Sequence, residues 1–384
     1  MLKTDTVPAY ARPLQVLPIP ALPVPAQRLQ SLDAYRGFIM LTLLAAGVFA
    51  PLKFFPKLHW LAVQTEHTEW QGCTFWDLIQ PSFMFMVGVA MPFAFARRQE
   101  TGQSWGRQFL HVLIRAVNLT LIGILLDHIG AAKIEIGFIR VLQQIAFGYV
   151  ICFFLLGRSF LTQGIVAGVI LVGYNLLWMF NRWNLPGQPW AIGNHNIGSA
   201  FDLWMLHRNY RGFYVGMNAI PSTATILFGV MAGQLLQRRL PHKQTMLILL
   251  IAGAAGVLLG LAVSHWLPPI KRIWTPSFAV LAGGLTTLML LCFYAVIEVL
   301  GWRRWSFPLI VVGTNSIAAY VIGNAAFKGW FRGASSAWVA WVWNTRLGWP
   351  LDTPQYNMLS GLLFTCFAWV VLFWCYRRKV FFKL

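Results

Sequence analysis

Long apolar runs alternate with short polar connections along most of the chain. Several of these runs exceed the roughly 18 to 20 residues that a helix needs to cross a bilayer. The pattern therefore predicts an all-α, polytopic transmembrane bundle of about ten spans, with nine to eleven as the range if one segment is re-entrant. The expected spans are 35–55, 74–96, 109–129, 139–157, 161–181, 214–236, 244–264, 276–300, 308–327 and 356–376.

The first thirty residues follow a different pattern, with prolines at positions 8, 13, 18, 20, 23 and 25. They lack a continuous apolar core followed by a small-residue cleavage site, so they do not read as a signal peptide. We expect 1–30 to form an extended, polyproline-like cytoplasmic tail and 31–384 to form one transmembrane domain. The sequence shows no internal repeat and no glycine-rich phosphate loop.

Composition agrees with this pattern, since 58% of the 384 residues are hydrophobic and only 11% are charged. Cationic residues mark every second connection, and the positive-inside rule then places both termini on the cytoplasmic side of the membrane. The net charge of +19 occurs in short clusters beside apolar spans, which indicates contact with anionic lipid headgroups and not with nucleic acid. The five cysteines are scattered singly and show no metal-ligand or disulfide spacing.

The stretch EHTEWQGCTFWDLIQPSF places Glu66, His67 and Asp77 at the entrance of the second span. A histidine can take a proton from an attacking hydroxyl or amine, or carry an acyl group, and a carboxylate can fix its tautomer. An ionisable group at membrane depth normally faces a cavity or a partner. The alternative is that His67 is an interfacial loop residue and that Asp77 stabilises a helix N-terminus capped by Thr74.

Other polar residues interrupt or flank the spans, and most have a structural alternative. Arg36 either pairs with Asp33 or receives an anion at the cytoplasmic mouth, and Arg115 is expected to snorkel. The candidates for lining a cavity or binding a polar substrate, with interhelical hydrogen bonding or an interfacial helix as the alternative, are Arg140, Gln143, Asp202 and Asn315. Two further candidates for binding, Lys271 and Trp274, are expected at the mouth of the eighth span.

Six ordered blocks between about 28 and 320 carry a resemblance. RLQSLDAYRGF and EHTEWQGCTFWDLIQPSFMFMVGVAMPF, followed by VLQQIAFGY, IPSTATILFGVMAG, KRIWTPSF and VGTNSIAAY, resemble the heparan-α-glucosaminide N-acetyltransferase family of membrane acyltransferases and its bacterial relatives. The family's active-site histidine falls on His67 and its intramembrane aspartate on Asp77. The chain departs from the family pattern at Gly47, Ile139, Arg140, Gln144 and Ile270.

The resemblance implies a membrane enzyme that moves an acetyl group from cytoplasmic acetyl-CoA, the donor substrate, to an amine or hydroxyl of a sugar-like acceptor on the outer face. His67 would act as general base or accept the acetyl group transiently, and both mechanisms stay open. The expected partners are membrane lipid, the acyl-CoA donor, a glycan or other outer-face acceptor, and a second copy in a homodimer. A transporter or flippase for a polar or lipid-linked solute is the alternative, and a non-catalytic scaffold is the third reading. A pair of broken helices would favour transport. We find no such pair in the sequence.

Overall fold

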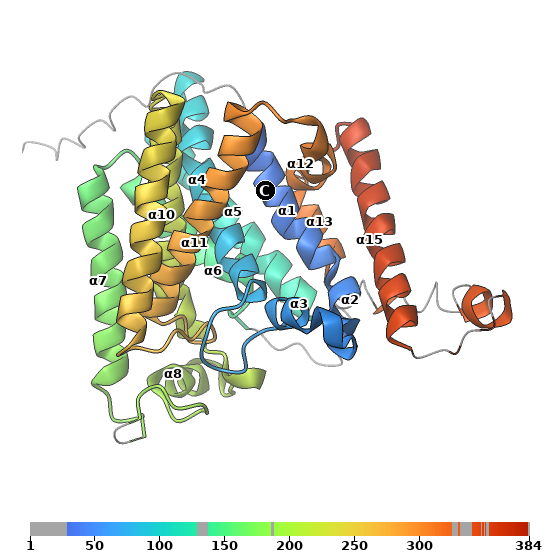
Figure 1. Ribbon diagram of the computed structural model, residues 1–384. Helices are drawn as coiled ribbons and strands as arrows, with labels where there is room; N and C mark the ends of the chain where they lie inside the picture. Colours follow the sequence, from blue (N-terminus) through green and yellow to red (C-terminus); the bar gives the residue numbers. More distant parts are fainter. Residues whose placement is uncertain are drawn as a thin grey trace, which may run out of the picture.

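The computed structural model describes residues 29–128, 137–185, 188–324, 329–330, 340–346, 348, 350 and 353–382. The predicted proline-rich tail therefore lies almost wholly outside the described residues. The helices are α1 Gln30–Leu44, α2 Ala46–Phe49, α3 His59–Gln64, α4 Ile79–Glu100, α5 Trp105–His128, α6 Val141–Leu155, α7 Phe160–Met179, α8 Ile197–Leu206, α9 Ala219–Gln237, α10 His242–Ser264, α11 Pro276–Tyr294, α12 Phe307–Thr314, α13 Ser316–Ile322 and α15 Pro354–Arg377 (Figure 1). None of the described residues forms a strand, so the all-α prediction is confirmed.

Among the described residues, the number of candidate spans reaches the predicted range of nine to eleven only at its upper count. Within the described residues, seven helices are long and apolar enough to cross a membrane, and nine qualify if each of two bent pairs counts as one span. The predicted span 139–157 contains only the 15-residue helix α6, about 22 Å long at 1.5 Å per residue against a hydrocarbon core of about 30 Å. The protein is a membrane protein by its apolar helices, and the count of ten is not confirmed.

Two predicted spans are broken. The first bends by 52° between α1 and α2, and the ninth bends by 73° between α12 and α13, where Asn315 interrupts the helix. α1 packs against both α12 and α13, so the two broken elements are neighbours. The sequence analysis found no such pair, and the structure corrects that interpretation.

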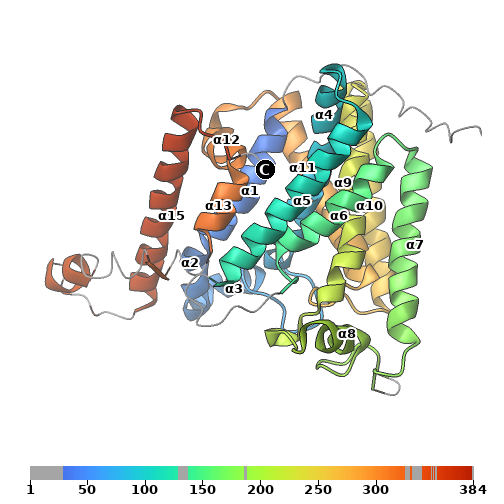
Figure 2. The same cartoon turned by 180° about the vertical axis from the view of Figure 1, so that it is seen from behind.

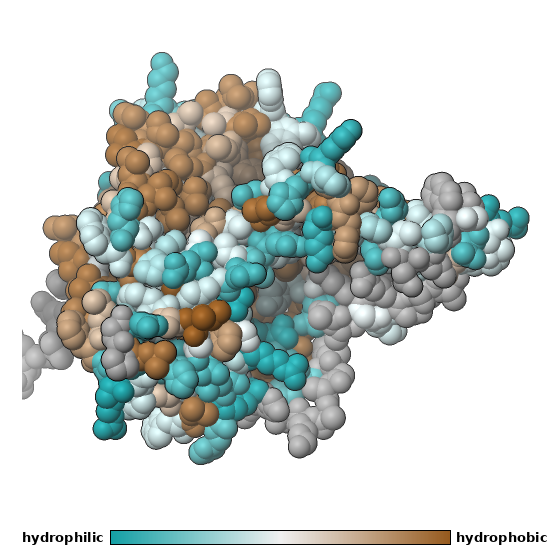
Figure 3. All heavy atoms as spheres, turned by 60° about the horizontal axis from the view of Figure 1, so that its bottom comes forward, coloured by the Kyte–Doolittle hydropathy of each residue, from teal (hydrophilic) through white to brown (hydrophobic). Residues whose placement is uncertain are grey.

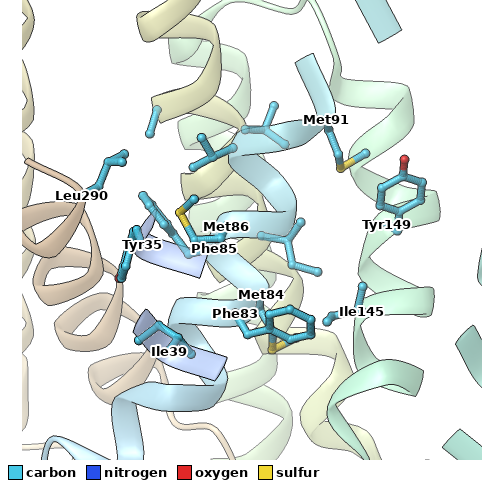
Figure 4. Packing of buried hydrophobic residues seen from close by; sticks show 14 of the residues in the cluster. Tyr35, Ile39, Phe83, Met84, Phe85, Met86, Met91, Ile145, Tyr149 and Leu290 are labelled. Carbon is cyan, nitrogen blue, oxygen red and sulfur yellow. The ribbon is translucent and has the colours of Figure 1, made fainter. Parts of the chain in front are cut away.

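Two helices form the centre of the bundle. α4 and α9 are buried over most of their apolar length, whereas α5, α7 and α10 leave most of theirs exposed. Figure 4 shows side chains of α4, among them Met84 and Phe85, packed between Tyr35 of α1, Leu290 of α11 and Ile145 of α6. An apolar outer surface is what a bilayer requires, and Figure 3 shows hydrophobic side chains gathered on one flank beside a more hydrophilic loop face.

Glycine allows α4 and α9 to approach each other closely. A Cβ atom added to Gly88 would lie 2.0 Å from the carbonyl oxygen of Ile226, and one added to Gly229 would lie 2.0 Å from that of Phe85. Small residues let membrane helices pack backbone to backbone, where dispersion contacts replace the hydrophobic driving force. This contact fixes the position of α4, which begins just after Asp77.

The two ends of the bundle differ in charge and structure. The connections α4–α5, α6–α7 and α9–α10 lie together at the upper end in Figure 1, and we call this the basic end because it carries Arg98, Arg107, Arg158 and Arg238. The loop between α3 and α4, which holds His67, lies at the opposite end with α8 (Figures 1 and 2). The loop that contains His67 therefore lies at the end of the bundle opposite to most of the short basic connections.

Candidate functional site

Three ionisable side chains meet at the entrance of α4. His67 Nδ1 lies 2.7 Å from Asp77 Oδ1, and Lys271 Nζ lies 3.4 Å from the same oxygen. Asp77 is 1% exposed and the Lys271 side chain is 7% exposed, whereas the His67 side chain is 45% exposed. The carboxylate and ammonium are thus a buried ion pair, and the imidazole is the member of the group that an incoming molecule can reach.

The loop before α4 is folded around the carboxylate of Asp77. Its second oxygen, Oδ2, accepts hydrogen bonds from the backbone N–H of Thr68 at 3.2 Å and of Thr74 at 3.3 Å. The hydroxyl of Thr68 donates to it at 3.2 Å. The hydroxyl of Thr74 also lies 3.0 Å away, but its one proton is directed to the carbonyl of Glu66 at 2.7 Å. Three neutral donors therefore hold one oxygen while His67 and Lys271 approach the other, which satisfies a charge that is costly to bury alone.

A turn before α11 delivers Lys271 to this loop. The N–H of Trp274 donates to the carbonyl of Lys271 at 3.0 Å, and Trp274 adopts a left-handed conformation with φ 53°. Thr275 closes the turn, because its hydroxyl accepts from the N–H of Ile270 at 2.9 Å. The two segments join directly where the N–H of Gly72 donates to the carbonyl of Pro269 at 2.8 Å. These bonds hold Lys271 close to Asp77, although the two residues are 194 positions apart in the chain.

The geometry assigns the proton on the imidazole. An ionised carboxylate only accepts hydrogen bonds, so the short contact to Asp77 requires a proton on Nδ1 of His67. Lys271 Nζ is also 3.3 Å from Nδ1, but the protonated nitrogen cannot accept, and we assign the Lys271 bond to the carboxylate. The other nitrogen, Nε2, makes no hydrogen bond within the described residues and is left as the basic atom. Burial lowers the pKa of Lys271, and the Asp77 carboxylate opposes that shift.

A cavity of about 170 Å³ opens beside His67. Its described lining is mostly apolar and includes Met40, Ile79 and Phe83, with His67, Lys271, Gln80 and Tyr320 as the polar members. A largely apolar pocket with a few convergent polar groups is the usual form of a small-molecule site.

A chain of amides supports one wall of the cavity. Gln80 Nε2 donates to Gln144 Oε1 at 2.7 Å, and Gln144 Nε2 donates to Asn218 Oδ1 at 2.6 Å. Asn218 in turn donates to the carbonyl of Arg272, next to Lys271, at 3.3 Å. Because the donors all point the same way along this chain, the carbonyl oxygen of Gln80 remains as an acceptor at the cavity.

A second, smaller cavity of about 60 Å³ lies nearer the basic end and is lined by Arg36, Arg115 and Phe83 among others. Phe83 belongs to the lining of both cavities and stacks on Tyr320, with ring centres 6.2 Å apart. Arg36 is 3.8 Å from Asp33, and the Arg115 guanidinium lies 4.7 Å from the ring centre of Tyr149. Phe83 therefore borders both the cationic cavity and the cavity that contains His67.

The remaining candidates from the second and fourth spans lie around the site without touching the ion pair. The side chain of Glu66 is exposed and lies 3.9 Å from Lys53 Nζ. Arg140 pairs with Asp127, and its N–H donates to the side chain of Gln143 at 3.0 Å. Arg140 also lies beside Tyr320 of the cavity wall, whereas Gln143 belongs to the α6 cap.

Two further candidates lie elsewhere in the described structure, and a third, Trp274, belongs to the turn that carries Lys271. Asp202, on α8, accepts the N–H of Gly216 with both oxygens at 3.1 and 3.0 Å; burial raises its pKa to about 6, and that hydrogen bond opposes the shift. Asn315 donates to the carbonyl of Val380 at 3.0 Å and accepts the N–H of Phe382 at 3.1 Å, so its amide joins the α12–α13 break to the C-terminal segment. Trp274 is fully buried in the Lys271 turn.

Sequence reasoning missed several residues of the site. Thr68 had no assigned role, and Gln80 and Asn218 were not singled out. The spacing offers one signal, since Gln80 follows Asp77 by three residues and so lies about one helical turn along the same face. Nothing in the local pattern points to Asn218, which reaches the site only through the fold. No group of three or more potential metal ligands occurs among the described residues.

Comparison with known proteins adds a partial match. Residues 28–169 match a domain of unknown function, DUF5009. This segment includes His67, Asp77 and Gln80 but ends well before Lys271. None of the curated proteins matches the chain.

Proposed function

We propose that the protein is a membrane acyltransferase that uses acetyl-CoA as donor and His67 as its reactive group. The observation that carries the proposal is the 2.7 Å contact between His67 Nδ1 and buried Asp77, at the lip of a cavity. A carboxylate that fixes the tautomer of a histidine, and leaves its other nitrogen open to substrate, is the arrangement used in acyl-transfer triads. The sequence resemblance to membrane N-acetyltransferases supports the same reaction.

Two routes use this geometry. In the first, His67 Nε2 removes the proton from an amine or hydroxyl as that group attacks the thioester carbon; the C–S bond breaks and the imidazolium returns the proton to the thiolate. In the second, Nε2 itself attacks, forming an N–acetyl bond as the C–S bond breaks and the thiolate leaves; the acceptor then displaces the imidazole, and the acceptor's proton passes to the thiolate. Asp77 holds the ring in the same orientation in both.

Lys271 has a distinct role in this proposal. Its ammonium lies beside the carboxylate and also lines the cavity, so it can donate to the oxygen on which negative charge develops during thioester cleavage. The apolar remainder of the lining limits water, which would hydrolyse an activated acetyl group. We propose that the basic end faces the cytoplasm. The cavity lined by Arg36 and Arg115, which shares Phe83 with the His67 cavity, then places positive charge on the side from which an anionic donor would enter.

The first experiment measures transfer from radiolabelled acetyl-CoA to glucosamine, used as the amine probe, by the purified protein in detergent. His67→Ala should abolish transfer, whereas His59→Ala, a change of an exposed histidine on the preceding helix α3, should leave the rate unchanged. Acetyl-CoA should also raise the melting temperature of both variants, because a ligand of the folded state stabilises it. Wild-type transfer by His67→Ala would show that the histidine assignment is wrong.

A second experiment separates the two routes. Label from acetyl-CoA that stays on the protein in the absence of glucosamine, and disappears in His67→Ala, would indicate an acetyl-histidine intermediate. Absence of label together with normal transfer would indicate general-base catalysis.

Transport of a polar solute remains the second candidate because of the two broken helices. Discontinuous helices packed against each other near a polar chamber are typical of secondary transporters, and here α1–α2 adjoins α12–α13. Solute uptake into proteoliposomes that contain no acyl donor would favour transport, whereas acetyl-CoA-dependent product without uptake would favour the acyltransferase.

A further inference from the structure

An apolar groove, separate from the His67 site, runs between α7, α9, α10 and α11. It has a volume of about 420 Å³, and its lining is aliphatic, aromatic or glycine except for Thr287. The hydroxyl of Thr287 is already satisfied, since it donates to the carbonyl of Gly283 at 2.8 Å. The groove therefore presents no polar group in need of a partner.

Such a groove is unfavourable both when it is filled with water and when it is empty. Its volume corresponds to about fourteen water molecules at about 30 Å³ each, yet a site without polar partners does not hold water. An unfilled groove would forfeit dispersion contacts along its whole lining. α7 and α10 also face outward with most of their apolar length exposed, so the surrounding medium has access. A hydrocarbon chain is the occupant that fits both the chemistry and the access.

The length of the groove corresponds to one leaflet. On α7 its lining extends from Phe160, the first residue of the helix, to Leu171. This distance is about 16 Å at 1.5 Å per residue, against about 15 Å for half of a hydrocarbon core of about 30 Å. On α10 the lining extends over a similar length, from Ile248 to Leu259.

Cationic side chains stand where the headgroup of such a lipid would lie. The guanidinium of Arg238 is 4.4 Å from the ring centre of Phe160, which closes the groove at its basic end. Arg158 lies two residues before Phe160 and is exposed. The sequences of α7, α9, α10 and α11 contain no aspartate or glutamate, so no acid in these four helices offsets this charge.

From the apolar lining, the leaflet-matched length and the two arginines, we infer that the groove is a binding site for one anionic phospholipid. One acyl chain lies along α7, and the phosphate meets Arg238 and Arg158. The inference does not depend on acetyl transfer, because none of the residues that line the groove lines the His67 cavity.

Two glycines of α7 allow a matched test. A Cβ atom added to Gly168 or to Gly173 would have nothing within 4 Å, so both positions accept a side chain, but only Gly168 lines the groove. The protein would be equilibrated in detergent with equal amounts of phosphatidylglycerol and phosphatidylethanolamine, washed, and analysed by native mass spectrometry. Wild type and Gly173→Leu should retain one phosphatidylglycerol, and Gly168→Leu should retain at least about tenfold less lipid.

The headgroup contact has its own variant. Arg238→Gln should keep the bound lipid but reduce the preference for phosphatidylglycerol about fivefold, the effect of roughly one cation near the headgroup. Arg107→Gln, at the same end but on α5, should leave the preference unchanged. Equal retention by wild type and Gly168→Leu would overturn the inference. So would conversion of a dimer to a monomer by Gly168→Leu with no change in lipid, because the groove would then be a surface for a second copy of the chain.

Discussion

Replacing Asp77 with asparagine tests the central contact of the site with almost no change in shape. The amide keeps one carbonyl oxygen, but its –NH₂ group must occupy the place of either Oδ1 or Oδ2. In the first case it meets His67 Nδ1 and Lys271 Nζ, and in the second it meets the donors of Thr68 and Thr74. Every orientation therefore places a donor against a donor and removes the charge that balances Lys271.

The magnitudes follow from this geometry. Removing one member of a buried ion pair costs about 3 to 5 kcal/mol, although deprotonation of Lys271, whose pKa burial already lowers, would reduce that cost. The amide also favours the imidazole tautomer with its proton on Nε2, which removes the basic atom from the cavity. The same change in a serine-protease triad lowers kcat about 10⁴-fold, and we expect a loss of about 10³- to 10⁴-fold here.

The assay combines acetyl transfer to glucosamine with thermal unfolding in detergent. Glu69→Gln is the matched control, because it makes the same chemical change at an exposed acid of the same loop. Adding Lys271→Met to Asp77→Asn should restore part of the lost stability, since the pair is then neutral, without restoring transfer. A rate above about a tenth of wild type in Asp77→Asn, far above the loss that the tautomer mechanism requires, would refute the orienting role of the carboxylate.

Three other changes give independent checks. Burial raises the pKa of Asp202 from 3.8 to about 6, so the folded state holds this proton more tightly than the unfolded state does. About 3 kcal/mol of stability should therefore be lost as pH rises from 4 to above 6. Asp202→Asn should remove this pH dependence from melting curves recorded across the same range. Gly229→Ala should lower the free energy of unfolding by about 1 to 3 kcal/mol, because its Cβ would meet the Phe85 carbonyl at 2.0 Å. Gly106→Ala, with nothing within 4 Å, should not lower the melting temperature. Gln80→Leu leaves the side-chain oxygen of Gln144 without its donor and should cost about 1 to 3 kcal/mol in the same melts.

The sequence predicts the helices well because span length and apolar content are local properties. It places the bends poorly, since the break at Asn315 coincides with an amide bonded to the C-terminal segment, a contact that local periodicity does not encode. α6 is similar: its predicted span includes residues before Val141 that the structure does not place in a helix.

Some contacts of the candidate site could likewise be predicted from the sequence, and others could not. The proximity of His67 and Asp77 could be anticipated because they lie ten positions apart on one short loop. Lys271 could be placed at the mouth of a span, but its contact with Asp77 depends on how α4 and α11 pack. Gln143 and Asn315 show a different limit, because an amide that caps a helix or joins two segments has the same appearance in the sequence as one that lines a cavity.

The distance in the chain between Asp77 and Lys271 has a consequence for biosynthesis. The ribosome adds 194 residues between them, which takes about 10 to 40 s at about 5 to 20 residues per second. During that interval the acid has entered the membrane boundary while its cation has not yet been made. His67, Thr68 and Thr74, translated beside it, can then supply its hydrogen bonds, so this loop can stabilise the carboxylate until Lys271 is made.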